Sequence, residues 1–427
     1  MKNYEVLKKK ITAIGGNHFG RLYGSDNKCI ENQINRYISV LEKFELFSNK
    51  PDPQFFSSPG RTEIGGNHTD HNHGKVLAGA VNLDNVAVTA TNNSDTVKIL
   101  SSGYEPFTVS LSNLLPVDEE KNNSSALVRG IVSRLKELGY NIGGFDAVID
   151  SGVPKGSGLS SSASFEVLIA TIFNHLFNDG IIAPTQIALI GQYAENVYFG
   201  KPCGLMDQIA CACGGLVAID FANPLNPEAR KINFDFLKSG FALIITNTGG
   251  SHDNLTAEYA SVFSEMKSVA EFLGAKTLRE TNLEKVLEAI PAMRHKTGDR
   301  ALLRAIHFYS DNQRVEKQVE ALEQNDFNTF LTLVTESGYS SYMLNQNIYT
   351  FNDRHEQSVA LGLAVSELIL KGCGAWRVHG GGFAGTIQTF VPEILSDNYI
   401  NSMENIFGKE SCYKLFIRED GAVKIDF

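Results

Sequence analysis

Apolar residues follow two different periods along the 427-residue chain, and these periods predict a mixture of helices and strands. Up to about residue 50 the apolar positions from Ile34 to Leu46 recur at helical spacing, which predicts helices that pack on the domain that follows. Pro51 then interrupts the helical pattern. A helical run also covers 123–139, and short strand-like runs occupy 81–90, 95–100, 107–111 and 145–150.

The second half of the chain continues the mixture with a larger share of helix. Strand-like runs lie at 214–221, 241–247 and 386–392, and helical runs at 251–345 and 358–372. The composition shows no sharp shift, so the domain boundaries are soft. We expect a helical N-terminal extension, a first domain and a second domain, at 1–50, 51–230 and 231–427.

Composition and charge then narrow the class of protein. With 43% hydrophobic and 20% charged residues the chain can bury a substantial core, which indicates a globular protein. The formal net charge of −10 argues against nucleic acid as a partner. No apolar run reaches the roughly 18 residues of a membrane span, so we expect a cytoplasmic protein without a membrane partner. The six cysteines are spaced irregularly and predict neither a disulfide framework nor a zinc site.

A loop rich in glycine and serine opens one strongly apolar helix. Glycine allows the backbone to approach a ligand, and the first amides of a helix favour an anion, so the loop predicts a phosphate site. The spacing does not match the Walker A pattern, and a helix capped by its serine hydroxyls remains the alternative. The candidate binding residues are Gly156, Ser157, Gly158, Leu159, Ser160, Ser161 and Ser162.

Three further segments carry candidate chemistry. The polar run at 60–74 makes a poor core strand and suits a loop that holds a polyhydroxylated substrate, although its three histidines leave a metal site as an alternative. The segment at 203–208 contains Asp207, and Glu195 precedes it on a helix. Phosphoryl transfer to a hydroxyl needs a proton acceptor, a magnesium carboxylate and a cation, which Asp207, Glu195 and Arg61 would supply. The glycine cluster at 380–385 would add a backbone surface near the ligands.

In their order and spacing these four segments resemble the motifs of the GHMP family of small-molecule kinases. They resemble most of all the motifs of the galactokinase branch of that family. The segments read GRTEIGGNHTDHNHG, PKGSGLSSSASFEV, CGLMDQ and GGGFAG. The likeness spans about residue 51 to the C-terminal end. It implies a two-domain α/β (α+β) fold with mixed sheets, helices and an active site in the cleft between the domains. It also implies ATP and Mg²⁺ as cofactors, a small-molecule sugar as substrate, and phosphorylation of the C1 hydroxyl of galactose.

Carried over to this sequence, the resemblance implies a role for each matching residue. Asp207 would be the catalytic base and Arg61 would steady the transferring phosphoryl group. Ser162 and Glu195 would bind magnesium, and the amides of the glycine-serine loop would hold the phosphates. Gly381 and Gly382 would line the cleft. Sugar contacts are implied for Asn67, His68, Asp70, Tyr259 and Gly204. We expect a monomer and leave an oligomer open.

Three positions of the first motif depart from the galactokinase pattern, and one of them is His71 in place of the usual tyrosine. Asn67 stands where a glutamate usually meets the sugar's 6-hydroxyl, and Glu63 stands where asparagine is usual. A neutral amide bonds a hydroxyl more weakly than a carboxylate does, by about 1 kcal/mol. Loss of the carboxylate also removes a repulsion against a sugar acid, so a related sugar or a sugar acid such as galacturonate remains an alternative substrate.

A different class of function is a sugar and ATP sensor that binds both ligands on the same scaffold and controls a partner without catalysis. The presence of Asp207, Glu195 and Arg61 argues against it. A dehydrogenase is disfavoured because the chain lacks a GxGxxG fingerprint in its expected arrangement.

Overall fold

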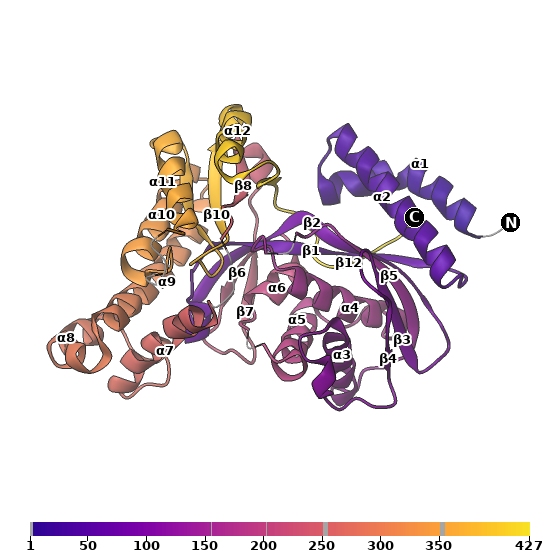
Figure 1. Ribbon diagram of the computed structural model, residues 1–427, viewed down its shortest axis with the longest axis horizontal. Coiled ribbons are helices and arrows are strands. Elements are labelled where there is room, and N and C mark those ends of the chain that lie inside the picture. The colour runs from indigo at the N-terminus through magenta and orange to yellow at the C-terminus, as the bar shows by residue number, and fades with distance from the viewer. Residues whose placement is uncertain (1–2, 155, 202, 251–254, 351–354) are drawn as a thin grey trace.

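The computed structural model describes residues 3–154, 156–201, 203–250, 255–350 and 355–427. The N-terminal extension is helical, as expected, and the structure shows that it forms a hairpin. Its two helices are α1 (Asn3–Tyr23) and α2 (Asn27–Phe47), and Asp26 caps the second by accepting a hydrogen bond from the amide of Cys29. Both helices lie on one side of a large sheet (Figure 1).

The first sheet contains strands from both ends of the chain. Its order is β12-β1-β2-β5-β3-β4, with β6 paired to β2 and β7 paired to β6. All of these pairs are antiparallel except β3 with β5. The strands are β1 (Gln54–Gly65), β2 (Lys75–Thr91), β3 (Thr96–Ser101), β4 (Phe107–Ser110), β5 (Phe145–Ser151), β6 (Leu216–Asp220), β7 (Glu228–Ile232) and β12 (Val423–Ile425).

Side chains that alternate along the strands give this sheet two buried faces. Val86 and Val88 of β2 pack under the helical hairpin, whereas Ala87 faces the opposite layer. That opposite layer, seen below the sheet in Figure 1, consists of α3 (Ser124–Glu137), α4 (Ser161–Phe177), α5 (Pro184–Tyr193) and α6 (Met206–Cys213). A sheet covered on both faces explains why the central strands carry long apolar runs.

A buried carboxylate in β2 ties the hairpin and the C-terminal segment to the sheet. Asp84 is fully buried and accepts hydrogen bonds from Tyr23 (2.6 Å), Arg36 (2.7 Å), Arg418 (3.2 Å) and Ser57. The donors come from α1, α2, β1 and the segment before β12. Burial of charge is tolerated here because every Asp84 oxygen has a partner.

The second half of the chain forms a smaller sheet flanked by helices. Its order is β11-β8-β10-β9, and all its pairs are antiparallel. The strands are β8 (Phe241–Asn247), β9 (Ala375–His379), β10 (Thr386–Pro392) and β11 (Cys412–Leu415). The helices are α7 (Thr256–Phe272), α8 (Leu283–Thr297), α9 (Asp299–Glu323), α10 (Phe327–Ser340), α11 (Ser358–Leu370) and α12 (Ser396–Phe407). The helical prediction also includes 251–254, which lie outside the described residues.

An apolar cluster joins the two halves. Ile64 and Leu77, from the ends of β1 and β2, pack in one core with Ile245, Phe330 and Phe390 of the second half. The two sheets and their helices confirm the predicted mixed α/β fold. The domain boundaries stay a prediction, although the last strand of the chain pairs with β1 of the first sheet rather than with the second.

One sequence expectation was wrong at the level of local structure. Residues 60–65 were expected in a loop because of their polar side chains, yet they complete the buried strand β1. The strand accommodates Arg61 and Glu63 because each forms an ion pair with a residue distant in sequence, Asp207 and Arg377. Local polarity in the sequence does not reveal these distant partners.

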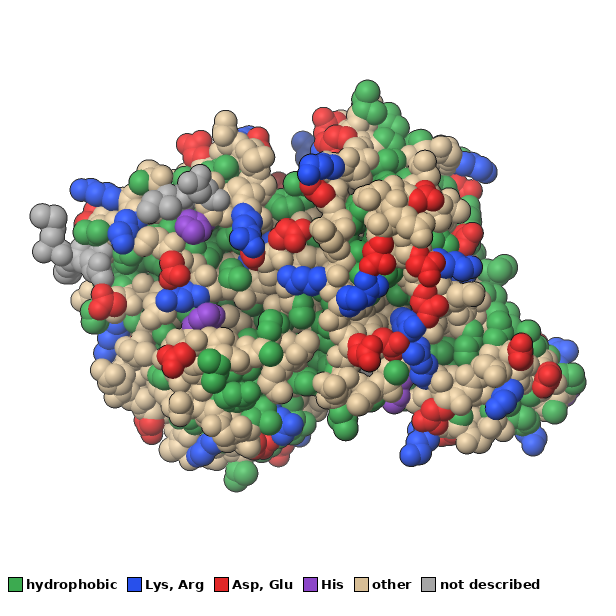
Figure 2. Space-filling model, turned by 180° about the vertical axis from the view of Figure 1, so that it is seen from behind, with side chains coloured by type: hydrophobic (Ala, Val, Ile, Leu, Met, Phe, Trp, Pro, Cys, Tyr) green, Lys and Arg blue, Asp and Glu red, His purple; other side chains and the backbone are tan. Residues whose placement is uncertain are grey.

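The surface charges and the cysteines do not point to a particular function. Figure 2 shows side chains of both charges intermixed over one face, without a broad area of a single charge. The six cysteines are free thiols. Among the helices that the structure describes, none combines the length and the apolar character that a membrane span requires.

Candidate active site

The N-terminal end of α4, the first turn of α6 and the connection from β9 to β10 line one cavity of about 270 Å³. The cavity therefore brings together the chemistry-bearing segments that the sequence singled out, although they lie far apart along the chain. Its described lining residues are Arg61, Pro154, Gly156, Gly158, Ser160, Ser161, Ser162, Glu195, Lys201, Cys203, Asp207, His379, Gly380, Gly381, Gly382, Ala384 and Thr386.

The glycine-serine loop contributes five of its seven predicted residues to this lining. Ser157 is buried and its hydroxyl donates to the carbonyl oxygen of Pro154 (2.7 Å). Leu159 is buried in the core that joins the two halves, and its carbonyl oxygen accepts the amide N–H of Arg61 (3.0 Å). These two residues hold the loop in place rather than face the cavity. Lys155 of the same loop lies outside the described residues.

The first turn of α4 has no side-chain cap at Ser160, so the alternative of a helix capped by its serine hydroxyls is not observed there. Ser160 adopts a left-handed backbone (φ +58°), and its hydroxyl donates to Asp207 Oδ2 (2.7 Å). Gly158 is also left-handed (φ +68°), and a Cβ there would lie 2.7 Å from Thr386 Oγ1. The amides of a helix start without a cap are suited to an anion, as predicted for phosphate.

Arg61 and Asp207 form a two-point ion pair at the cavity wall. Arg61 Nε lies 2.7 Å from Asp207 Oδ1, and Nη2 lies 2.7 Å from Oδ2. Arg61 Nη1 donates to the carbonyl oxygen of Gly158. The Arg61 side chain is 8% exposed and that of Asp207 is 29% exposed, so the carboxylate is the member of the pair that reaches the cavity.

The pair keeps Asp207 ionised. Burial alone would raise the pKa of Asp207, but the charge of Arg61 and the hydrogen bonds from Arg61 and Ser160 outweigh it and lower the pKa below its ordinary value. Oδ2 accepts two hydrogen bonds and Oδ1 accepts one. Because a carboxylate oxygen has two lone pairs, Oδ1 retains, with respect to the described residues, one acceptor position for a ligand hydroxyl.

Glu195 reaches the cavity from η3 (Ala194–Phe199), a turn of π-helix that follows α5. Gln208 Nε2 donates to Glu195 Oε2 (3.1 Å) and to Glu166 Oε2 (3.0 Å), so one amide bridges two buried carboxyl groups. Burial and the neighbouring Glu195 raise the pKa of Glu166 well above its ordinary value. Sequence analysis missed Glu166 and Gln208, although both lie within the quoted motifs.

The donor set of the cavity suits magnesium held together with a nucleotide. In the part of the chain that the structure describes, no group of three His, Cys, Asp or Glu side chains is arranged to hold a metal, and the three-histidine alternative therefore has no such group behind it. Glu195 and the hydroxyl of Ser162 line the same cavity. Mg²⁺ commonly takes one or two protein oxygens and completes its shell with water and substrate phosphates.

The residues predicted to contact the sugar lie around the motif at 60–74 and do not line this cavity. Asp70 and Gly204 adjoin each other, because a Cβ at Gly204 would stand 2.0 Å from Asp70 Oδ2. His68 Nε2 lies 2.8 Å from the carbonyl oxygen of Gly381, and burial lowers the pKa of His68 to about 4. The Tyr259 hydroxyl donates to the carbonyl oxygen of Gly382 (3.0 Å). Together with Asn67, which donates to the carbonyl oxygen of Gly380, three of the five residues thus contact the glycine cluster that lines the cavity.

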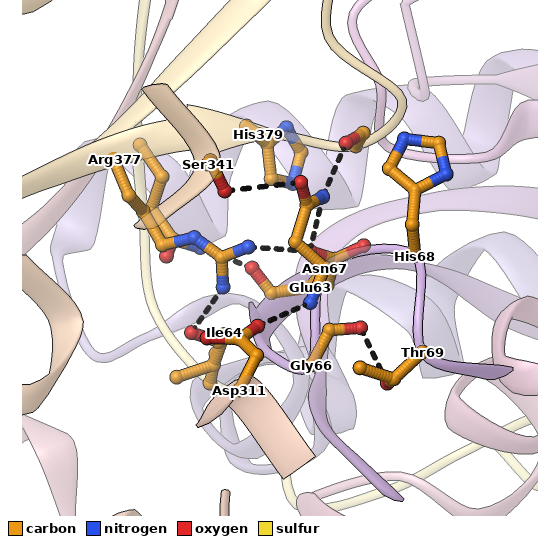
Figure 3. Close-up of polar contacts among 12 residues, drawn as sticks. Glu63, Ile64, Gly66, Asn67, His68, Thr69, Asp311, Ser341, Arg377 and His379 are labelled. Carbon is orange, nitrogen blue, oxygen red and sulfur yellow. Dashed lines mark hydrogen bonds and ion pairs between the residues drawn. The ribbon is translucent and has the colours of Figure 1, made fainter. Parts of the chain in front are cut away.

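Asn67 occupies a position that the sequence did not predict. Its side chain is fully buried, and its Nδ2 donates to Glu63 Oε1 (3.0 Å) and to the carbonyl oxygen of Gly380 (2.8 Å). Its Oδ1 accepts from Ser341 (3.2 Å) and Asn347 (2.8 Å). Figure 3 shows this amide enclosed by Glu63, Ser341 and neighbouring backbone. In this conformation the side chain has used its hydrogen-bonding capacity on protein groups and offers none to a sugar.

Arg377 completes that network from β9. Its Nη2 lies 2.6 Å from Glu63 Oε1, and its Nη1 donates to the carbonyl oxygen of Ile64 (2.5 Å). Figure 3 places the guanidinium between these two groups. Glu63 therefore accepts from both Arg377 and Asn67, which links the end of β1 to the second sheet through buried polar contacts.

Two family models match parts of this chain. The family model described as the GHMP kinases N terminal domain matches residues 126–215, and the model described as the galactokinase galactose-binding signature matches residues 42–91. The predicted resemblance to the GHMP kinases is confirmed. The class of enzyme that these matches support is an ATP-dependent sugar kinase.

Solved structures share the fold at low sequence identity. The galactokinase of Lactococcus lactis, solved with galactose, matches with a TM-score of 0.78 and 23% identity over 91% of this chain and 100% of that chain. The mevalonate kinase of Methanococcus jannaschii matches with a TM-score of 0.61 and 15% identity over 86% of this chain and 98% of that chain. The phosphomevalonate kinase of Streptococcus pneumoniae matches with a TM-score of 0.58 and 14% identity, over 87% and 99% of the two chains.

Proposed function

We propose that this GHMP kinase transfers the γ-phosphoryl group of ATP to the C1 hydroxyl of galactose, with Mg²⁺ as its metal. The observation that carries the proposal is a single cavity. Arg61, Asp207, Glu195 and the helix start at Ser160, Ser161 and Ser162 all face it. A phosphoryl transfer site requires a nucleotide cradle, a metal carboxylate and a hydroxyl acceptor within one enclosure.

Asp207 would accept the hydrogen bond of the sugar's C1 hydroxyl at the remaining lone pair of Oδ1. Because its pKa is lowered, Asp207 holds a proton weakly. We therefore expect the carboxylate to orient the hydroxyl first. It takes the proton as the bond from oxygen to the γ-phosphorus forms and the bond from that phosphorus to the bridging oxygen breaks.

Arg61 has two roles in this proposal. It fixes the orientation of the Asp207 carboxylate through two hydrogen bonds, and it keeps a positive charge where the transferring phosphoryl group disperses its negative charge. The amides at the start of α4 would hold the phosphates, and Ser162 with Glu195 would bind magnesium. Magnesium, when bound, neutralises charge on the phosphate oxygens.

For the sugar we propose contacts from Asp70, with His68, Tyr259 and Gly204 shaping the same region. The sugar-acid alternative was based on the missing carboxylate at position 67. The Asn67 amide is buried and bonded to protein groups, so this residue favours neither galactose nor a sugar acid. The residues that argue against the sensor alternative, Arg61, Asp207 and Glu195, all line one cavity.

The test is a coupled assay of ADP release with MgATP and four sugars: galactose, galacturonate, N-acetylgalactosamine and glucose. We expect the highest kcat/KM with galactose. ADP release with none of the sugars, in the presence of measurable ATP binding, would instead support the sensor. A preference for galacturonate would overturn the substrate and leave the kinase chemistry in place.

A further inference from the structure

Lys201 is a residue of the cavity that the sequence motifs do not explain. It follows the π-helical turn η3, which ends at left-handed Gly200 (φ +88°). The amides of Gly200 and Lys201 both donate to the carbonyl oxygen of Glu195, at 3.0 and 3.2 Å. The backbone of Lys201 is therefore fixed against the residue that we propose as the metal carboxylate. A π-helical turn of this kind often occurs at a functional site.

The side chain of Lys201 reaches into the open part of the cavity. It is 63% exposed, lines the cavity, and places Nζ 3.4 Å from Glu195 Oε1. This is a single, long contact, and an ammonium group has three N–H donors. The flexible four-carbon stem allows the charge to move by several ångströms without a change in the backbone.

The charges around the cavity show why this lysine matters. The described lining carries two carboxylates, Glu195 and Asp207, and two permanent cations, Arg61 and Lys201. Arg61 gives Nε and Nη2 to Asp207 and Nη1 to the carbonyl oxygen of Gly158. His379 also lines the cavity, but burial and the charge of Arg61 lower its pKa well below the ordinary value, so it is neutral. Among the described residues, Lys201 is thus the cation that is not already held by a two-point ion pair.

We propose that Lys201 binds the phosphates of the nucleotide, with Glu195 holding the ammonium group beside the phosphate cradle until the nucleotide arrives. The inference rests on the proposed ATP-dependent function. A triphosphate brings several negative charges into a cavity whose described lining is balanced at two charges of each sign. An ammonium group on a flexible stem, held by one long contact to Glu195, is well placed to meet them.

The test compares nucleotide binding by Lys201→Met and Lys201→Arg with that of the unmodified chain. Titration calorimetry would measure the Kd of ADP and of adenosine, each with Mg²⁺ and with a chelator. Lys238→Met is the matched control, because this lysine is 85% exposed and does not line the cavity. A thermal melt of each variant checks that the chain folds.

We expect Lys201→Met to weaken ADP binding roughly 10- to 100-fold, both with and without Mg²⁺, and to leave adenosine binding unchanged. Lys201→Arg should restore most of the affinity, and Lys238→Met should match the unmodified chain. A loss that appears only with Mg²⁺ would overturn the inference, since it would mean that Lys201 acts by placing Glu195. Equal ADP binding by Lys201→Met and the unmodified chain would also overturn it and leave the kinase proposal intact. Failure of the unmodified chain to bind either ADP or adenosine would overturn both this inference and the proposed kinase function.

Discussion

Asp84 and Asp207 both form ion pairs with arginine, and they differ in how far their carboxylates are open to a further partner. Asp84 lies between the helical hairpin and the first sheet, with Arg36, Arg418, Ser57 and Tyr23 around it and no exposure to solvent. Asp207 is held by Arg61 and Ser160, but its side chain is 29% exposed and one oxygen keeps a lone pair. We therefore assign a structural role to the fully buried ion pairs of Asp84 and propose the catalytic role for Asp207, whose carboxylate reaches a cavity.

The largest expected effect separates the two aspartates by activity. Asp207→Asn should lower kcat by roughly 10²–10⁴ because the amide cannot take the proton of the acceptor hydroxyl. ADP binding should stay close to that of the unmodified chain, whereas the melting temperature should fall, because the buried Arg61 loses the charge of its partner. ADP release with galactose and a thermal melt measure the two quantities. Turnover near that of the unmodified chain would exclude Asp207 as the base.

For Asp84 we expect a loss of stability without a loss of turnover. Asp84→Asn leaves Arg36 and Arg418 without their shared carboxylate, and we expect the free energy of unfolding to fall by about 3–5 kcal/mol. The kcat of the folded fraction should not change. Denaturant unfolding measures the stability, and a variant as stable as the unmodified chain would contradict the structural role of Asp84.

The same aspartate predicts a pH dependence. Burial opposes the charge of Asp84, but Arg36 and Arg418 outweigh it and lower its pKa below the ordinary value. A carboxylate with a lowered pKa in the folded state stabilises the protein above its unfolded pKa of about 4, and this contribution is lost as the pH falls through the lower, folded value. The acid limb of the stability curve should therefore be flatter in Asp84→Asn, as unfolding measured from neutral to acidic pH would show.

The next prediction concerns the buried network at Asn67. Asn67→Glu would place a second carboxylate beside Glu63, so we expect the free energy of unfolding to fall by about 1–3 kcal/mol without a change in sugar preference. The double variant Glu63→Asn, Asn67→Glu restores the arrangement usual in galactokinases and should lose less stability than the single variant. Improved use of galactose together with lost use of galacturonate in Asn67→Glu would instead mean that residue 67 contacts the sugar during catalysis.

The smallest expected effect concerns the amide that bridges Glu195 and Glu166. Gln208→Met should raise the Mg²⁺ concentration for half-maximal turnover by roughly tenfold, because Glu195 loses the group that orients it. The kcat at saturating Mg²⁺ should change much less. A magnesium titration of ADP release measures the shift, and an unchanged titration would show that Gln208 does not orient the metal carboxylate.

The sequence predicted the elements better than their contacts. Apolar periodicity identified the helical character of the first 50 residues and most of the strands, because those patterns are local. It misplaced residues 60–65, since the partners that stabilise Arg61 and Glu63 within a strand, Asp207 and Arg377, are distant in the sequence. Local polarity cannot distinguish a charged residue in solvent from one that is paired in the core.

For the candidate site, the sequence predicted which residues belong together but not all of their contacts. Motif order indicated that Arg61, Asp207, Glu195 and the serine run belong together, and the structure places all of them around one cavity. The position of Asn67 could not be foreseen, because its four partners come from β1, the segment after α10 and the glycine cluster. Lys201 gave no signal either, since a lysine in a loop is ordinarily a solvated side chain.

The most direct test of the central claim is the identity of the product. Phosphorus NMR of a reaction that contains the protein, MgATP and galactose should show ADP together with a sugar phosphate whose phosphorus couples to the anomeric proton. The same reaction with Asp207→Asn should show almost none of this product over the same time. A phosphate on any other hydroxyl, or an equal yield from Asp207→Asn, would contradict the account of a C1 kinase that uses Asp207 as its base.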